Sequence, residues 1–301
     1  MIRIFILIMC LLNLSLVACT RKKSEIGTSE NPVKFFFVPS VDVKVIEDTS
    51  KVLEKYLEAN TPYKYKILIP PSYIAVVEAF GTKRADVAVI NTFGYLLAHD
   101  RYGARAALTT IRHGESTYKA QFLARADSEI KKLEDLEGKK VAFVDPASTS
   151  GYLLPLKFLK DRKIKPKETM FAMRHDNVVS MIYQGQVDAG ATFYSPPADG
   201  QIQDARRLVK AQYPDVEEKV VIIELTSPIP NDPVIFRKDL PDEMVNKITS
   251  SLRNFAGTAE GKETLQKLSS VTGLAPSTDK DYDQTRQILR DLGKSASELV
   301  K

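Results

Sequence analysis

The chain has 301 residues, of which 44% are hydrophobic and 27% are charged, and its formal net charge is +5. This composition is that of an ordinary globular protein, and the length suits two domains of common size. The small positive surplus forms no basic cluster interleaved with aromatic residues, so we expect no binding to nucleic acid.

Residues 1–18 have the form of a secretory signal peptide. An almost unbroken apolar run covers residues 4–12, which is shorter than the roughly 20 residues that a bilayer crossing needs. The segment ends in Leu-Val-Ala-Cys at 16–19, which resembles a bacterial lipobox. Cys19 would then carry a lipid and start the mature chain; the alternatives are a plain secretory peptide with a chance cysteine, or a short anchor helix.

The two cysteines, Cys10 and Cys19, agree with this interpretation. Cys10 lies within the signal peptide, so the mature chain would have no internal disulfide, iron–sulfur cluster or thiol nucleophile. Residues 19–32 are mostly polar, and we expect a flexible lipidated tether there. A lipid on Cys19 would anchor the protein to a membrane without spanning it.

From residue 33 onward, short apolar runs alternate with helical patterns. In the first half, we expect strands at 33–38, 65–69 and 86–90 and helices at 41–59, 73–80 and 93–99. In the second half, we expect strands at 141–144, 189–192 and 220–225 and helices at 151–161 and 177–184. The part from Asp242 onward reads as helical with no strand. The alternation predicts an α/β protein with mainly parallel sheets.

Two linker-like segments indicate how the domains are arranged. One covers residues 112–118, and the other is the proline-dense segment 227–233. If the chain passes between the two α/β blocks at both segments, the second block is inserted into the first. We therefore expect one lobe from residues 33–115 plus 230–301 and a second lobe from residues 116–229.

Three consecutive hydroxyl residues, Ser148, Thr149 and Ser150, form the most informative motif. They follow an expected strand and precede a glycine that opens an expected helix. The free N–H groups and the positive dipole end of a helix attract an anion at such a place. No lysine or arginine lies in the segment, so we expect mainly neutral donors to hold the anion. An ordinary N-cap is the alternative.

Signatures of an enzyme are weak. Ser-x-x-Lys occurs at 116–119, but the Ser-Asp-Asn and Lys-Thr-Gly motifs that would accompany it are missing. The three histidines, His99, His113 and His175, are far apart and form no metal pair. We expect no catalysis, no metal and no cofactor. An enzyme on the same scaffold would have His175 as its only candidate base.

Two sequence blocks are specific in combination: Ser-Thr-Ser-Gly-Tyr at 148–152 and Ser-Pro-Ile-Pro-Asn-Asp-Pro at 227–233. Weaker segments are Val-Pro-Ser at 38–40, Ala-Asp-Val-Ala at 85–88, Leu-Glu-Asp-Leu-Glu-Gly-Lys-Lys at 133–140, His-Asp at 175–176 and Gly-Gln-Val-Asp-Ala-Gly-Ala at 185–191. With these segments the chain resembles the phosphate, phosphite and phosphonate solute-binding proteins of bacterial ABC importers, over nearly the whole mature chain.

The resemblance implies a type II periplasmic-binding-protein fold, in which two α/β lobes on a hinge close over a ligand. It implies that Ser148, Thr149 and Ser150 are the primary donors to the ligand oxyanion. His175 would be a further contact from the second lobe, and the alternative for it is a satisfied core or loop histidine. Asp176 would orient the imidazole or cap the following helix.

The resemblance also implies tyrosine contacts from the first lobe. Tyr95 matches the family's tyrosine after the Asp-x-Ala strand, and Tyr73 is a second candidate; either could be an ordinary core aromatic. Tyr118, at the crossing into the second lobe, is a weaker candidate.

Two departures from the family pattern concern the rest of the ligand. Members that bind aminoalkyl phosphonates place carboxylates opposite the oxyanion site, whereas the segment 189–194 contains no acidic residue. Asn91-Thr92 stands where a Gly-Pro step is common. Phosphate, phosphite, a phosphonate without an amino group or an unrelated solute therefore all remain open as ligands.

The implied role is that of a monomeric, extracytoplasmic lipoprotein of the bacterial cell envelope that faces the periplasm or the exterior. It would deliver a small anionic ligand to its cognate ABC permease and ATPase. The alternative role is that of a sensor, or of an importer component for a different small solute.

Overall fold

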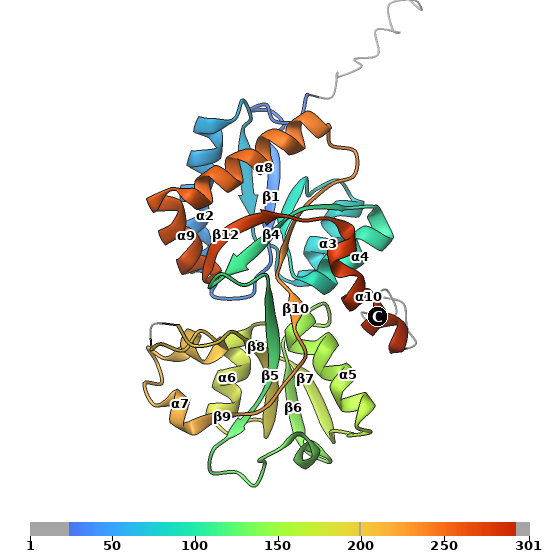
Figure 1. Cartoon of the computed structure of the whole chain (residues 1–301), viewed down its shortest axis with the longest axis vertical. Helices are drawn as coiled ribbons and strands as arrows, with labels where there is room; N and C mark the ends of the chain where they lie inside the picture. The colour runs from blue at the N-terminus through green and yellow to red at the C-terminus, as the bar shows by residue number, and fades with distance from the viewer. Residues whose placement is uncertain (1–23, 199, 293–301) are drawn as a thin grey trace, which may run out of the picture.

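The computed structural model describes residues 24–198 and 200–292. These residues form two α/β lobes that are stacked along the longest axis of the molecule (Figure 1). The expected signal peptide and the expected lipidation site Cys19 lie outside the described residues. None of the helices in the described ranges combines the length and the apolar character that a bilayer crossing requires.

The first lobe is built on a six-stranded mixed sheet. Across the sheet, its strands are β12 (Val271–Pro276), β4 (Arg105–Arg112), β11 (Pro233–Phe236), β3 (Val87–Val89), β1 (Val33–Phe37) and β2 (Tyr65–Leu68). β1 is parallel to β2 and β3, whereas β11 is antiparallel to β3 and β4. Phe35 and Phe37 pack into one core and Phe36 into another, because successive strand residues point to opposite faces.

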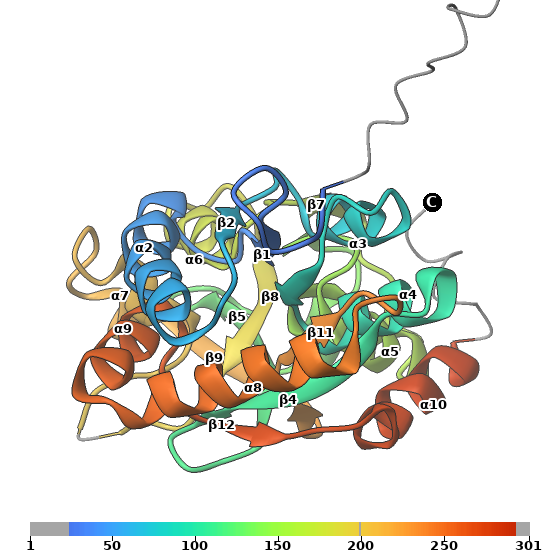
Figure 2. The same cartoon turned by 90° about the horizontal axis from the view of Figure 1, so that it is seen from above.

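Helices cover both faces of this sheet. One group consists of α2 (Val43–Asn60), α8 (Asp242–Gly257) and α9 (Ala259–Ser269). The other consists of α3 (Tyr73–Gly81), α4 (Thr92–Tyr102), α10 (Asp283–Asp291) and the short 3-10 helix η5 (Asp279–Tyr282). Figure 2 shows the two groups on opposite sides of the lobe. α2 is amphipathic, and Ile46, Leu53 and Leu57 on its buried side belong to the same core as Phe35 and Phe37 of β1.

The second lobe has its own mixed sheet. Its strands are β10 (Ile229–Pro230), β5 (Thr117–Arg125), β8 (Ala189–Tyr194), β6 (Lys140–Phe143) and β7 (Glu168–Phe171) in that order, and β9 (Val220–Leu225) also pairs with β5. Its helical elements are η2 (Leu133–Leu136), η3 (Thr149–Leu153), α5 (Leu154–Asp161), α6 (His175–Tyr183), η4 (Ala205–Val209) and α7 (Val216–Lys219). β6 is parallel to β7 and β8, and these three strands end toward the first lobe.

Asn231 fastens the two chain crossings to each other. This side chain is fully buried, and its Nδ2 donates to the carbonyl oxygen of Glu115 at 2.8 Å. The backbone N–H of Asn231 donates to the carbonyl of Ser116 at 2.9 Å, and Arg112 Nη1 donates to Asn231 Oδ1 at 3.3 Å. The crossings therefore form one bonded unit, which is where a hinge between the lobes would lie.

The observed strands revise three expectations. The part after Asp242 is not wholly helical, because Val271–Pro276 forms the edge strand β12; an edge strand tolerates the glycine and proline that hide its character in the sequence. The expected linker at 112–118 is shorter in the structure: residues 113–116 form a turn between β4, which ends at Arg112, and β5, which begins at Thr117. Pro230 pairs with Thr117 in the second sheet, not in the first.

The segment before β1 is also more ordered than the expected tether at 19–32. From residue 24 onward it forms hydrogen-bonded turns, in which Asn31 Nδ2 donates to the carbonyl of Ser24 at 2.8 Å. The N–H of Lys64 donates to the carbonyl of Gly27 at 2.7 Å, which ties these turns to the chain just before β2.

Candidate ligand-binding site

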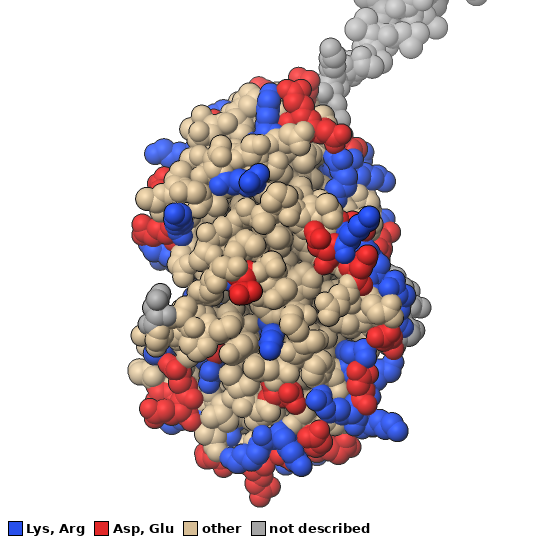
Figure 3. All heavy atoms as spheres, viewed as in Figure 1, with Lys and Arg blue, Asp and Glu red and all other residues tan. Residues whose placement is uncertain are grey.

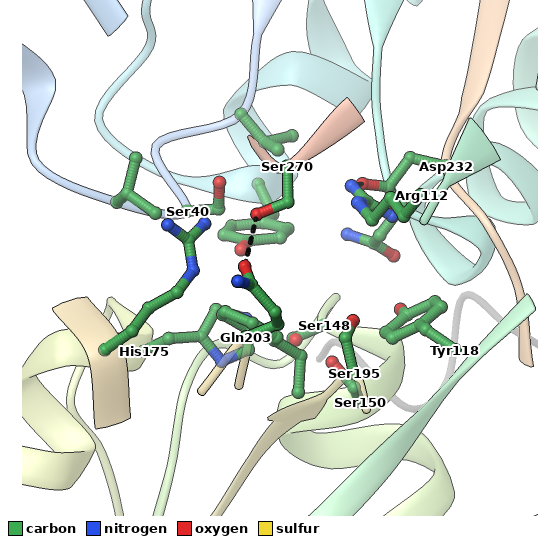
Figure 4. A pocket seen from close by; sticks show the side chains of 16 residues that line it. Ser40, Arg112, Tyr118, Ser148, Ser150, His175, Ser195, Gln203, Asp232 and Ser270 are labelled. Atoms are coloured by element: carbon green, nitrogen blue, oxygen red, sulfur yellow. Dashed lines mark hydrogen bonds and ion pairs between the residues drawn. The ribbon is translucent and has the colours of Figure 1, made fainter. Parts of the chain in front are cut away.

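A cavity lies between the lobes, where parallel strands of both sheets end (Figure 4). Its volume is about 70 Å³. A single water needs roughly 10–15 Å³, so the space suits a compact ligand. The polar lining consists of Ser40, Tyr73, Asn91, Arg112, Tyr118, Ser148, Ser150, His175, Ser195, Gln203, Arg207, Asp232 and Ser270.

Ser148 and Ser150 reach the cavity from the turn that follows β6. Ser148 caps the first turn of η3, where its Oγ accepts a hydrogen bond from the N–H of Gly151 at 3.1 Å. Its hydroxyl hydrogen is then still available to a ligand. A Cβ atom on Gly151 would lie 2.5 Å from Cβ of Val144, so only glycine lets this turn pack against the chain after β6. Ser148 is thus both an N-cap and part of the cavity wall.

Thr149 does not line the cavity with its two neighbours. Its Oγ1 donates to Asn91 Oδ1 at 2.8 Å and accepts from the N–H of Phe93 at 2.8 Å. Both partners belong to the first lobe, so this hydroxyl bridges the lobes. The expectation that the Thr149 hydroxyl is a primary oxyanion donor therefore needs revision, because its single hydrogen is already donated to Asn91.

Asn91 links this interlobe bond to the cavity. Its Oδ1 accepts from Thr149 and also from the N–H of Gly94 at 2.9 Å, which caps α4. Its Nδ2 is buried, and among the described residues it has no hydrogen-bond partner. Because the Asn91 side chain lines the cavity, a ligand oxygen is the natural acceptor for this amide group.

Two tyrosines contribute neutral donors to the wall. Burial, and then the charge of Asp145, raises the pKa of Tyr73 well above its usual value, and its hydroxyl is hydrogen-bonded to Ser40. Burial, and then the charge of Asp232, raises the pKa of Tyr118, and its hydroxyl is hydrogen-bonded to Ser150. Both phenols therefore stay protonated. Tyr73, a first-lobe candidate, and Tyr118, the weaker candidate, both reach the cavity.

His175 also lines the cavity, at the first turn of α6. Burial, and then the positive charge of Arg112, lowers the pKa of His175 to about 3, so the imidazole is neutral at pH 7. Its Nδ1 is buried and has no partner among the described residues, and its ring packs edge-on against Phe193 at 5.0 Å. Asp176 does not orient the imidazole; both of its carboxylate oxygens accept hydrogen bonds from Arg174.

Tyr95 lies outside the cavity wall. Its hydroxyl donates to Asp279 Oδ1 at 2.7 Å, and its ring packs against Tyr282 with 4.8 Å between ring centroids. Both contacts belong to the core under α10 and η5. The family-based expectation for Tyr95 therefore does not match this structure, whose geometry fits the alternative of a core aromatic.

Charged residues occur in the cavity, although the local sequence around residues 148–150 suggested mainly neutral donors. Arg112 Nη2 donates to Asp232 Oδ2 at 2.6 Å, and Figure 4 shows this pair on the side of Tyr118. Arg207 also lines the cavity, and among the described residues nothing accepts a hydrogen bond from its Nε. Burial, and then the charge of Arg112, lowers the pKa of Arg207, but a guanidinium remains protonated.

The sequence analysis did not identify several of the residues that line the cavity. Some of them could have been found from their position in the sequence, and others could not. Ser40, Asn91 and Asp232 lie in or beside segments that carry the family resemblance, so their position could have suggested a role. Arg207 lies in a short polar turn with no motif, and nothing local separates it from Arg206. Gln203 and Ser270 meet across the cleft at 3.4 Å, a contact that only the tertiary structure reveals (Figure 4).

Known proteins with similar sequences have related roles. The profile of the family described as ABC transporter, phosphonate, periplasmic substrate-binding protein matches residues 35–282. The chain is 28% identical over 274 residues to a phosphate-import protein of Mycolicibacterium smegmatis, which covers 83% of each chain. It is 25% identical over 217 residues to a phosphonates-binding periplasmic protein of Escherichia coli, which covers 70% of this chain and 62% of that protein.

Solved structures share the fold. The binding-protein component of an ABC phosphonate transporter from Pseudomonas aeruginosa has a TM-score of 0.75 at 22% identity, covering 85% of this chain and 84% of that chain. A Prochlorococcus marinus protein solved in complex with methylphosphonate has a TM-score of 0.74 at 20% identity, covering 87% and 98%. These likenesses confirm the expected type II periplasmic-binding-protein fold. With a profile match over most of its length, the chain belongs to the family of phosphonate periplasmic substrate-binding proteins of ABC transporters.

Proposed function

We propose that this protein captures a small phosphorus oxyanion, such as phosphate, phosphite or a simple phosphonate, in the cavity between its lobes. The observation that carries the proposal is the convergence of Ser148, Ser150, Asn91 Nδ2 and Arg207 on one small cavity. Each of these groups donates hydrogen bonds, and together they can replace the hydration shell of an anion.

The relatives support this ligand class. One is a phosphate-import protein, another is a phosphonates-binding periplasmic protein, and a structural relative was solved with methylphosphonate. The small cavity agrees with a ligand of this size. The shared chemistry is a tetrahedral phosphorus centre with several anionic oxygens.

In this proposal the protein is the extracytoplasmic binding component of an ABC importer. Ligand enters between the lobes, the lobes close by a hinge motion through the two crossings, and the closed form delivers the ligand to its permease and ATPase. A lipid on Cys19 would keep the monomer near that permease. On the face shown in Figure 3, basic and acidic side chains are interspersed over both lobes, which gives no support to a nucleic-acid surface.

We propose binding without chemical conversion. His175 was the only candidate base in the sequence, and its pKa of about 3 makes it a weak one at neutral pH. In the described part of the chain, Asp232 is the one carboxylate that lines the cavity, and it is paired with Arg112. These features fit a site that holds an anion and releases it unchanged.

A binding screen tests the proposal. The chain without its expected signal peptide would be titrated with phosphate, phosphite, methylphosphonate, sulfate and a panel of amino acids while thermal stability is recorded. A ligand at 100 times its dissociation constant adds about 2.7 kcal/mol to the free energy of unfolding. We expect stabilisation by phosphorus oxyanions, and its loss in the double variant Ser148→Ala, Ser150→Ala. Stabilisation by sulfate or an amino acid alone would contradict the proposal.

A further inference from the structure

Two neighbouring arginines in η4 have opposite environments. Arg206 is buried, and its Nε and Nη2 donate to the two carboxylate oxygens of Asp204 at 3.0 and 2.8 Å. Its Nη1 donates to the carbonyl of Val220 at 3.0 Å. Arg207 lines the cavity, and in the described part of the chain it has no ion pair and no acceptor for its Nε. The guanidinium of Arg206 is hydrogen-bonded within the protein, whereas the guanidinium of Arg207 is available to a ligand.

Among the described residues, the carboxylates in the cavity wall and next to Arg207 in sequence have other partners. Asp232 is paired with Arg112 at 2.6 Å, and Asp204 is paired with Arg206. Asp145 accepts a hydrogen bond from the N–H of Ala147 at 2.8 Å and is not part of the cavity wall. Among the groups that line the cavity, the Arg112–Asp232 pair is neutral overall, and one positive charge, on Arg207, remains uncompensated.

We infer that Arg207 selects ligands by charge, so that the cavity accepts phosphorus oxyanions with an uncharged or anionic tail and rejects those with an ammonium tail. This inference rests on the proposed function and adds the class of substrate to it. Arg207 would neutralise part of the ligand's negative charge and act as a specificity-determining contact.

The physical reason is the small volume that the ligand and Arg207 share. An ammonium group on the ligand would be enclosed with a guanidinium, and among the described residues no free carboxylate lines the wall to offset their repulsion. Like charges that are partly removed from water repel strongly, because the effective dielectric constant is low. A cavity that presents an unpaired cation therefore discriminates against amino phosphonates even where they fit by size.

The test compares two ligands of the same shape. Ethylphosphonate and aminomethylphosphonate differ in that a methyl group replaces an ammonium group. By calorimetry, we expect the wild-type protein to bind ethylphosphonate at least about tenfold more tightly, since one charge-assisted contact is worth about 1.5–3 kcal/mol. Arg207→Gln should weaken ethylphosphonate binding about ten- to hundredfold and bring the two affinities together. Arg207→Glu should reverse the preference.

A matched control is Arg162→Gln in the same lobe. Arg162 is exposed, lies near Glu134 and Glu224, and does not line the cavity, so this variant should keep the wild-type preference. Equal wild-type affinities for the two ligands, or a preference unchanged in Arg207→Gln, would overturn the inference while the proposed function stands. Failure of every phosphorus oxyanion to bind the wild-type protein would overturn the proposed function itself.

Discussion

The two lobes contribute different chemical groups to the wall of the cavity. The second-lobe wall carries the hydroxyls of Ser148 and Ser150 and the unpaired cation of Arg207. The first-lobe wall carries the neutral phenol of Tyr73, the neutral amide of Asn91 and the mutually paired charges of Arg112 and Asp232. We infer that the second lobe captures the anion and that the first lobe completes its coordination only on closure. Affinity should therefore depend more on second-lobe residues than on first-lobe residues.

The largest expected effect comes from removing both serines of the second-lobe wall. Each hydroxyl donates to a charged oxygen, so the double variant Ser148→Ala, Ser150→Ala should lose about 3–6 kcal/mol of binding free energy. The first-lobe variant Ser40→Ala should lose less, about 1 kcal/mol, because it removes a single hydroxyl and leaves the second-lobe donors in place. Calorimetry with methylphosphonate measures both. Equal losses of binding free energy in the second-lobe and first-lobe variants would contradict the inference that the second lobe captures the anion and the first lobe only completes its coordination.

A pH series shows whether the positive charge of the second-lobe wall is confined to Arg207. The pKa of His175 is about 3 in the folded protein, below its unfolded value of about 6.5. The unfolded chain therefore binds the extra proton between these values, and the free energy of unfolding falls as pH decreases through that window.

His175→Gln should remove up to about 3 kcal/mol of this loss between pH 7 and pH 4, as measured by urea unfolding. Other groups titrate in both proteins, so their contribution cancels in the comparison. If the wild type and His175→Gln lose the same stability on acidification, His175 is not the buried neutral group described above.

Variants of Thr149 test whether its hydroxyl stabilises the closed arrangement of the two lobes. Thr149→Val keeps the branched shape but removes the bonds to Asn91 and to the N–H of Phe93. Leaving these buried groups unpaired costs about 1–3 kcal/mol in the closed form only, so ligand affinity should fall by about tenfold or more. Small-angle scattering with saturating methylphosphonate should show a larger radius of gyration. Thr149→Ser, which keeps the hydroxyl, is the matched control; unchanged affinity in Thr149→Val would contradict the interlobe role.

Much of the fold and part of the site could be predicted from the sequence. The apolar runs at β1, β3 and β6 are short and bounded by turn residues, so their strands are evident. The hydroxyl run before Gly151 could be identified as a candidate site, because its residue types suit a helix N-terminus, and Ser148 and Ser150 do line the cavity. The direction of the Thr149 hydroxyl was not predictable, since it depends on Asn91, which is 58 positions away. Arg207 was missed because two adjacent arginines differ only in tertiary environment.

The smallest effects separate the two tyrosine candidates. Tyr73→Phe removes a hydroxyl from the cavity wall and should weaken methylphosphonate binding by about 1 kcal/mol. Tyr95→Phe removes the hydroxyl bonds to Asp279 and to the backbone of Ala106, away from the cavity, and should lower the free energy of unfolding by about 1 kcal/mol with unchanged affinity. Calorimetry and urea unfolding on both variants give the comparison. An affinity loss confined to Tyr95→Phe would restore the family-based assignment.

A crystal structure of the protein with methylphosphonate tests the central claim most directly. We expect the phosphonate oxygens within hydrogen-bonding distance of the Ser148 and Ser150 hydroxyls and of the Arg207 guanidinium. The Thr149 hydroxyl should remain bonded to Asn91 across the cleft. A phosphonate bound through Thr149 and away from Arg207, or bound outside the cavity, would contradict the account.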